Sequence, residues 1–283
     1  MLTWRTLRDG ALPPARNMAV DEAVLRLHPA GPWDATLRFY AWSSPTLSLG
    51  YAQEFSAAVD EAACRARGVA VVRRPTGGWT VLHADELTYS IVSSSAGASF
   101  SGCGPLETYR RIALAFVKGL GAVGIEAALI SRAELARASE KAPSAGSPAP
   151  CFEIPSRHEV AAPDGRKLLG NAQRRIKESF LQHGSVPISI DRESLYAATG
   201  QEPSNGERFA ALGELTSAKL TPALLADVFT KAFAETFGAV CAPGTLTGEE
   251  EALAQKLERE KYATEEWNRM RREPERLRRA AGA

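Results

Sequence analysis

Short segments of alternating apolar and polar residues recur along this chain, and stretches with helical spacing separate them. At Leu37–Ala41 the alternation predicts a half-buried strand, because successive side chains of a strand point to opposite faces. At Pro105–Val123 the apolar residues recur at helical spacing and predict a long amphipathic helix. Strands that alternate with helices in this way predict an α/β or α+β fold around a mixed or antiparallel sheet, which helices flank.

The same patterns predict the other elements. The last two strands follow one another closely, so we expect them to form an antiparallel pair. Further strands are expected over 45–51, 69–72, 79–82, 87–93, 167–176 and 178–190. Further helices are expected over 13–27, 56–67, 132–141, 192–199, 221–237 and 248–272, with a loop over 143–150.

The balanced charge of the chain excludes a general polyanion binder. Its 34 lysines and arginines offset 33 acidic residues, whereas a nucleic-acid-binding protein usually has a basic excess on one face. Met1–Asp9 has no apolar run behind a basic region, and no stretch approaches the ~18 apolar residues of a membrane span. We therefore expect a cytoplasmic protein that binds neither nucleic acid nor membrane.

Among the four cysteines, Cys151 has the sequence context of a reactive thiol. None of the four falls in a C-x-x-C pair, so we expect no metal site. Cys64 stands in an alanine-rich helical segment that suits a buried thiol, and Cys103 and Cys241 have no neighbours that suggest chemistry. Cys151 follows a segment rich in Pro, Ser, Gly and Ala, a suitable place for a thiol that meets two substrates in turn. A positive charge nearby, such as that of Lys167, would favour its reactive thiolate form.

The segment Arg73–Trp79, Arg-Arg-Pro-Thr-Gly-Gly-Trp, suits close approach to a ligand. Gly77 and Gly78 have no Cβ, so the backbone can turn tightly and pass near a bound group. Arg73 and Arg74 could hold a phosphate or a carboxylate through charge-assisted hydrogen bonds. The spacing matches neither the Walker A loop nor the Rossmann glycine pattern. An ordinary turn with exposed arginines is the alternative.

Polar side chains share one face of the strand expected over 167–175. Lys167, Asn171 and Gln173 would lie on that face, and Gly170 and Ala172 on the opposite one. A lysine and two amides suit the binding of an acyl carbonyl group. A solvent-facing strand is the alternative.

Two histidines are ambiguous in the sequence. His183 precedes Gly184, and His83 opens the turn before Glu86. Each could be an acid or a base, or a turn histidine that bonds to the backbone. No partner for either side chain is visible in the sequence, so we assign neither a role in proton transfer.

Together these segments resemble the biotin/lipoate protein ligase family. Within it they are similar to the cysteine-dependent octanoyltransferases and amidotransferases of Gram-positive-type lipoate assembly, along nearly the whole chain. The ordered series that carries the resemblance is Asn17–Val24, Phe39–Trp42, Leu47–Tyr51, Arg73–Gly78, Val81–His83, Glu86–Ser90, Cys151-Phe152 with Pro155-Ser156, Lys167, Gly170, Ala172-Gln173, Leu181–Ser185, Lys261-Tyr262 and Glu266–Asn268.

The resemblance implies the catalytic-domain fold of that family, with residues 1–245 as the catalytic domain and 246–283 as its helical extension. It implies that Cys151 is the nucleophile and that Lys167 contacts the acyl carbonyl. The substrate-binding residues it implies are Arg73, Arg74, Thr76, Gly77, Gly78, His83, Gly170, Asn171, Ala172, Gln173, His183 and Gly184.

The implied reaction moves an octanoyl group from octanoyl-acyl carrier protein to a lysine of a lipoyl domain or of a glycine-cleavage H-type protein. Exchange of one thioester for another on Cys151 is nearly isoenergetic, so neither ATP nor another cofactor is expected. Acidic carriers would favour Arg73, Arg74, Arg174 or Arg175 near the entrance. Trp79 departs from the family pattern, and its bulk could shorten or reshape the acyl pocket.

Other interpretations stay open. An amidotransferase would take octanoyl from a glycine-cleavage carrier and pass it to another lipoyl domain. An ATP-dependent lipoate ligase would release pyrophosphate and leave Cys151 dispensable. A non-catalytic module would bind the carriers without turnover, and a biotin ligase would leave the cysteine segment without a purpose. The sequence does not identify the acyl length, the general base or the oligomeric state.

Overall fold

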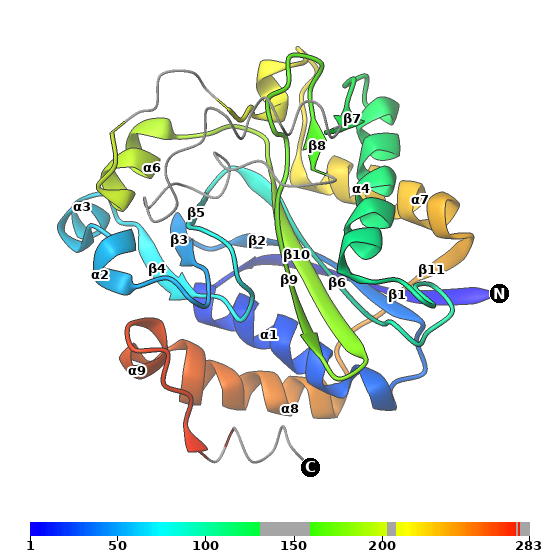
Figure 1. Cartoon of the computed structure of the whole chain (residues 1–283), viewed down its shortest axis with the longest axis horizontal. Coiled ribbons are helices and arrows are strands. Elements are labelled where there is room, and N and C mark those ends of the chain that lie inside the picture. The colour runs from blue at the N-terminus through cyan, green and yellow to red at the C-terminus, as the bar shows by residue number, and fades with distance from the viewer. Residues whose placement is uncertain (131–158, 203–207, 276, 278–283) are drawn as a thin grey trace.

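The computed structural model describes residues 1–130, 159–202, 208–275 and 277. Its centre is a six-stranded mixed sheet in the order β11-β1-β2-β6-β10-β9 (Figure 1). Strand β1 (Leu2–Leu12) runs parallel to β11 (Ala239–Pro243) and to β2 (Ala35–Trp42). The pairings of β2 with β6 (Glu86–Ser94), β6 with β10 (Ser179–Pro187) and β10 with β9 (Gly170–Ile176) are antiparallel. The predicted mixed sheet is confirmed.

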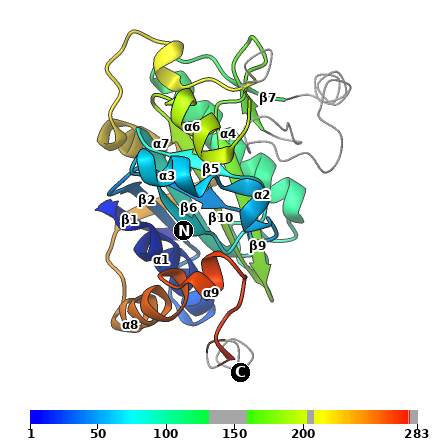
Figure 2. The same cartoon turned by 90° about the vertical axis from the view of Figure 1, so that its left-hand side faces the viewer.

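Helices cover both faces of this sheet, as Figures 1 and 2 show. Helices α1 (Pro14–Leu27) and α8 (Gly248–Leu257) lie on one face, and α4 (Pro105–Ala122) and α7 (Pro222–Phe237) lie on the other. Leu37 and Phe39 of β2 pack into the core beside α4 and α7, whereas Tyr40 and Trp42 pack into the core beside α1. The prediction of a half-buried strand here is therefore wrong, because helices rather than solvent cover its second face.

A smaller sheet stands beside the first. It has the order β4-β3-β5 and consists of β3 (Thr46–Leu49), β4 (Ala70–Arg73) and β5 (Val81–His83). Helices α2 (Phe55–Ala58), α3 (Glu61–Ala66) and α6 (Arg192–Thr199) contribute to its core. The single helix expected over 56–67 is two helices, because Asp60 is extended and its Oδ1 caps α3 by accepting the N–H of Ala63 at 2.9 Å.

The chain after α8 also differs from the single helix expected over 248–272. A turn of π-helix, η4 (Glu258–Tyr262), is followed by the short helix α9 (Glu265–Asn268). Thr264 is extended and caps α9 by accepting the N–H of Trp267. The chain therefore changes direction at Thr264 and does not continue as one helix to residue 272.

The strand expected from Lys167 begins only at Gly170. Lys167 instead forms isolated bridges with Ala161 of β8 (Val160–Ala161) and with Phe209, because its backbone bonds to Arg208 and Ala210 rather than to β10. β8 pairs with β7 (Ala128–Leu129). The helix and loop expected over 132–150 lie outside the described residues. Over the ranges that the structure describes, no helix has the length and apolar character needed to cross a membrane.

Candidate functional site

A cavity lies between α1, the small sheet and the strands β9 and β10. Seven of the residues that line it are the predicted residues Arg74, His83, Gly170, Asn171, Ala172, His183 and Gly184, and the others are Met18, Tyr40, Trp42, Ser48, Val81, Thr88 and Ser185. The structure thus brings together most of the binding residues expected from the sequence.

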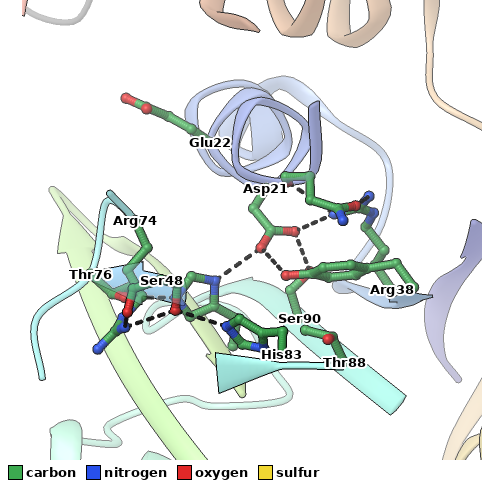
Figure 3. A network of polar contacts seen from close by, with 12 residues as sticks. Asp21, Glu22, Arg38, Ser48, Arg74, Thr76, His83, Thr88 and Ser90 are labelled. Carbon is green, nitrogen blue, oxygen red and sulfur yellow. Dashed lines mark hydrogen bonds and ion pairs between the residues drawn. The ribbon is translucent and has the colours of Figure 1, made fainter. Parts of the chain in front are cut away.

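Asp21 of α1 is the centre of one polar network at this cavity (Figure 3). Its Oδ1 accepts hydrogen bonds from Arg38 Nη1 at 2.8 Å and from Ser90 Oγ at 2.7 Å. Its Oδ2 lies 3.0 Å both from the Tyr40 hydroxyl and from His183 Nδ1. Burial alone would raise the pKa of Asp21, but Arg38, His183 and Ser90 hold it below the ordinary value. The carboxylate is therefore ionised and fully bonded.

His183 receives from Asp21 the partner that the sequence could not show. Burial lowers the pKa of His183 against the opposing effect of Asp21, so the imidazole is neutral near pH 7. Its Nδ1–H donates to the Asp21 carboxylate, and its Nε2 accepts from the Thr76 hydroxyl at 2.6 Å. Thr76 is thus fixed to the cavity wall through His183.

Glu86 is the centre of a second network on the same cavity. Its Oε1 lies 2.7 Å from His83 Nδ1 and also accepts from Trp42 Nε1 and Thr88. Its Oε2 accepts from the Ser185 hydroxyl. Burial alone would raise the pKa of Glu86, but its hydrogen-bond donors, His83 foremost, hold it below the ordinary value. The Trp42 ring stacks on His83 with the ring centroids 4.3 Å apart. This wall is held rigid by bonds among its own side chains.

Arg73 and Arg74 are both buried, so the expectation that they face a carrier at the entrance is wrong. Arg74 donates to the carbonyl oxygens of Ser48, Gly77 and Trp79 and to Ser48 Oγ, which lies 2.8 Å from His83 Nε2. The alternative of an ordinary turn with exposed arginines is excluded as well. Backbone carbonyls hold both guanidinium groups inside the protein because the loop folds around them.

The glycines of this loop are required by close contacts. Gly78 has a φ of +87°, which side chains rarely adopt. A Cβ on Gly50 would lie 1.8 Å from the carbonyl oxygen of Gly78, so these two segments touch through their backbones. A Cβ on Gly184 would lie 2.3 Å from the oxygen of Gly170, where β10 meets β9.

Lys167 and Gln173 do not line the cavity. Lys167 is buried and its Nζ lies 2.6 Å from Glu159 Oε1. Gln173 donates to Gln182 Oε1 at 3.2 Å. Cys151 lies outside the described residues. Burial raises the pKa of the Cys64 thiol, in keeping with its predicted packing role.

Trp79 is not among the residues that line the cavity. Its side chain packs against the cluster of Val81, Leu195 and Phe209, of which Val81 also lines the cavity. In the part of the chain that the structure describes, no three His, Cys, Asp or Glu side chains are grouped so that they could hold a metal ion.

Sequence reasoning missed Asp21, Glu86 and Ser48 as site residues. A signal existed for Asp21, since Asp21-Glu22 is a charged pair between the apolar residues Met18–Val20 and Ala23–Leu25, which are buried in the structure. A charged side chain is almost never fully buried unless it is paired. Ser48 gave no comparable signal, because its partners Arg74 and His83 come from other segments. Glu86 has His83 three residues before it, but nothing in the sequence singled out this pair.

The fold defines the class of protein. Lipoate-protein ligase A, solved with bound ATP, superposes with a TM-score of 0.77 at 25% identity, covering 95% of this chain and 99% of that one. The ligase of an archaeal lipoylation system from Thermoplasma acidophilum superposes with a TM-score of 0.76 at 24% identity, covering 97% and 99%. The architecture is thus that of the lipoate-protein ligase catalytic domain.

The chain belongs to the lipoyl protein ligase A/B catalytic domain family, which matches residues 13–234. Among its relatives is a protein named Octanoyltransferase LipM from Kyrpidia tusciae, 41% identical over 95% of this chain and 99% of the relative. A protein of the same name from Geobacillus kaustophilus is 37% identical over 94% and 97%. The predicted resemblance is confirmed.

Proposed function

We propose that this protein transfers an octanoyl group from a carrier-protein thioester to a lysine of a lipoate-dependent carrier domain, through a covalent thioester on Cys151. The chain is an acyltransferase of the octanoyltransferase type, which acts in lipoate biosynthesis. This proposal is supported above all by relatives named Octanoyltransferase LipM, which are 34–41% identical to this chain over nearly its full length. We also propose that residues 246–283 extend the same catalytic domain.

The cavity suits an acyl chain because its polar groups already bond to one another. Asp21, His183 and Thr76 form one chain of contacts, and Glu86 and His83 belong to another. Such groups need no hydrogen bond from a ligand, so an apolar chain can be buried beside them without leaving donors unsatisfied. Met18, Val81 and the Trp42 ring complete an apolar lining.

In the first step the Cys151 thiolate attacks the thioester carbonyl of the donor. The bond from Cys151 sulfur to the acyl carbon forms, the bond to the pantetheine sulfur breaks, and the carrier leaves as a thiolate, which takes up a proton from solvent. In the second step the neutral amine of the acceptor lysine attacks the acyl-enzyme. The amide bond forms, the bond to Cys151 breaks, and the amine proton leaves with the thiol or to solvent.

Lys167 would stabilise the negative charge that develops on the acyl oxygen in both steps. A preorganised donor of this kind typically contributes about 3 kcal/mol to transition-state stabilisation. The ion pair with Glu159 supports this role, because it holds the ammonium group in a fixed position. Donor and acceptor are expected to be octanoyl-acyl carrier protein and a lipoyl domain or an H-type protein of glycine cleavage.

Intact-protein mass spectrometry after mixing with octanoyl-acyl carrier protein, without ATP, tests the proposal. We expect a gain of one octanoyl group that is labile to hydroxylamine, present in Cys64→Ala and absent from Cys151→Ala. Acylation of a lipoyl domain only when ATP and free octanoate are supplied would instead make the protein a ligase. Donation from an octanoylated H-type protein but not from acyl carrier protein would make it an amidotransferase.

A further inference from the structure

Two pairs of adjacent residues connect the cavity to the C-terminal segment 258–273. On α1, Asp21 points toward the cavity network, whereas Glu22 points away from it (Figure 3). At the end of β4, Arg74 lines the cavity, whereas Arg73 bonds to α9. In each pair, one residue belongs to the cavity and its neighbour to the C-terminal segment.

Trp267 and Asn268 form hydrogen bonds with the backbone carbonyl and N–H groups of Arg73. Asn268 Oδ1 accepts the N–H of Arg73 at 2.8 Å, and Trp267 Nε1 donates to the carbonyl oxygen of Arg73 at 2.8 Å. β4 is an edge strand of the small sheet, so these groups would otherwise have no strand to pair with. Helix α9 thus closes the edge of β4 where the cavity loop begins.

The side chain of Arg73 bonds both to α9 and to the turn over 50–53. Its Nε donates to the carbonyl oxygen of Asn268 at 3.0 Å, and its Nη1 donates to the carbonyl oxygens of Gly50, Tyr51 and Gln53. Burial, together with the nearby Arg271, lowers the pKa of Arg73 to about 10, which still leaves it charged at neutral pH. One cation therefore joins α9 to the turn over 50–53.

That turn holds the cavity loop directly. The N–H of Tyr51 donates to the carbonyl oxygen of Thr76 at 2.7 Å, and Gly50 touches Gly78 through the backbone. Thr76 in turn bonds to His183, a residue of the cavity wall. A displacement of Arg73 would thus reach the cavity through two routes, the turn and the adjacent Arg74.

The C-terminal segment is itself anchored to α1. Lys261 Nζ lies 2.9 Å from Glu22 Oε2 and 3.9 Å from the centroid of the Trp267 ring, and Tyr262 donates its hydroxyl to Glu22. Lys261 and Glu22 are both fully buried. Lys261 and Tyr262 belong to the π-helical turn and both bond to Glu22 of α1. Because Trp267 contacts Lys261 and also donates to Arg73, it lies between α1 and β4.

We propose that Trp267 and Asn268 are positioning residues, which hold Arg73 so that the loop 74–78 keeps the shape of the acyl cavity and its selectivity for acyl length. This inference rests on the proposed acyl transfer and deepens it. By this inference the segment 258–273 contributes to acyl binding by supporting the cavity, without contacting the reacting atoms.

The test compares Asn268→Ala and Trp267→Phe with a matched control, Glu266→Ala, whose exposed side chain lies on the same helix. Trp267→Phe keeps an aromatic ring beside Lys261 and removes the N–H donor together with the five-membered ring of the indole. Hydrogen exchange of the peptide covering 74–78 is measured by mass spectrometry. Calorimetry gives the Kd for S-hexyl-, S-octyl- and S-decyl-pantetheine, thioethers that cannot transfer their chains.

We expect exchange over 74–78 to quicken in both test variants and the preference for the octyl probe to fall about ten-fold, as the loss of one buried hydrogen bond suggests. Glu266→Ala should match the unsubstituted protein. Unchanged hydrogen exchange and unchanged probe preference in folded Trp267→Phe would overturn the inference. If Asn268→Ala does not fold, the result for Trp267→Phe alone decides the test. Failure of the unsubstituted protein to form an acyl-enzyme would instead count against the proposed function, since the exchange and binding results do not depend on transfer.

Discussion

The Lys167 ammonium lies 2.6 Å from the Glu159 carboxylate, and both side chains are buried. The backbone of Lys167 is also fixed, because its N–H bonds to Arg208 and its carbonyl oxygen accepts the N–H of Ala210. A lysine held in this way has little freedom to move. The stability of the protein and the role proposed for Lys167 in acyl transfer therefore depend on the same side chain, and a single substitution would change both.

Lys167→Met should lower both acylation and the free energy of unfolding. The carboxylate of Glu159 would stay buried without this cation, a loss that typically costs about 3 kcal/mol. Adding Glu159→Gln should restore most of the stability, since the buried charge is then gone, but should not restore acylation. Urea unfolding and acyl-enzyme mass measure the two effects. Near-normal acylation by the folded double variant would remove Lys167 from the mechanism.

Gly50→Ala should destabilise the protein and impair acylation. The new methyl group would overlap the backbone oxygen of Gly78, so the cavity loop has to shift, which we expect to cost about 3 kcal/mol. Gly121→Ala is the matched control, since a Cβ there meets nothing within 4 Å. Thermal unfolding and the rate of acyl-enzyme formation are the measurements. Equal melting temperatures for the two variants would contradict the close approach of these loops.

Glu22 should make the protein sensitive to acid. Burial alone would raise the pKa of Glu22, but Lys261 and Arg26 hold it at about 2, below the ordinary 4.5. Because the folded-state pKa is depressed, the stabilisation is present above pH 4.5 and is lost as the pH falls from 4.5 toward 2. The shift corresponds to roughly 3 kcal/mol.

Urea unfolding of the unsubstituted protein and of Glu22→Gln near pH 7 and about pH 3 measures this contribution. The difference in free energy of unfolding between the two proteins should be largest at neutral pH and should shrink in acid. Other buried carboxylates are present in both proteins, so the difference isolates Glu22. A gap of the same size at both pH values would show that Glu22 is not held ionised by Lys261.

The sequence predicted those elements whose hydrophobic pattern is local. Helices α4 and α7 and the pair β9 and β10 follow from apolar spacing and are found close to their expected ranges. Strand β1 was missed because its pattern is interrupted by Arg5, which is buried and bonds to Glu250 at 2.7 Å. A partner 245 residues away leaves no trace in the local pattern.

The sequence predicted many of the residues of the candidate site but not the hydrogen bonds that join them. His83 and His183 were found, yet Asp21, which orients His183, is 162 residues away and only the fold brings these two together. Glu86 follows His83 by three residues, but the sequence did not show that the two side chains bond. The burial of Arg73 and Arg74 was equally invisible, because their acceptors are backbone carbonyls of other segments. Backbone acceptors have no residue-type signature, so sequence patterns could not have indicated them.

Acyl length should be set by Met18 rather than by Trp79. Met18 is buried and lines the cavity, whereas Trp79 packs outside it against Phe209 and its neighbours. Met18→Ala removes side-chain volume roughly comparable with the two extra methylene groups of a decanoyl chain, and each methylene in an apolar pocket typically contributes about ten-fold in selectivity. We therefore expect Met18→Ala to shift the ratio of decanoyl to octanoyl acylation upward by about ten-fold or more.

Trp79→Ala is the matched control for this shift. It should lower the melting temperature, because a partly buried aromatic ring is lost, and should leave the ratio of decanoyl to octanoyl acylation unchanged. Acyl-enzyme formation from the two donors, followed by intact mass well below each melting temperature, measures the ratio. A shift in Trp79→Ala without one in Met18→Ala would mean that the acyl chain runs along the Phe209 cluster, and the cavity beside α1 would then have to serve another purpose.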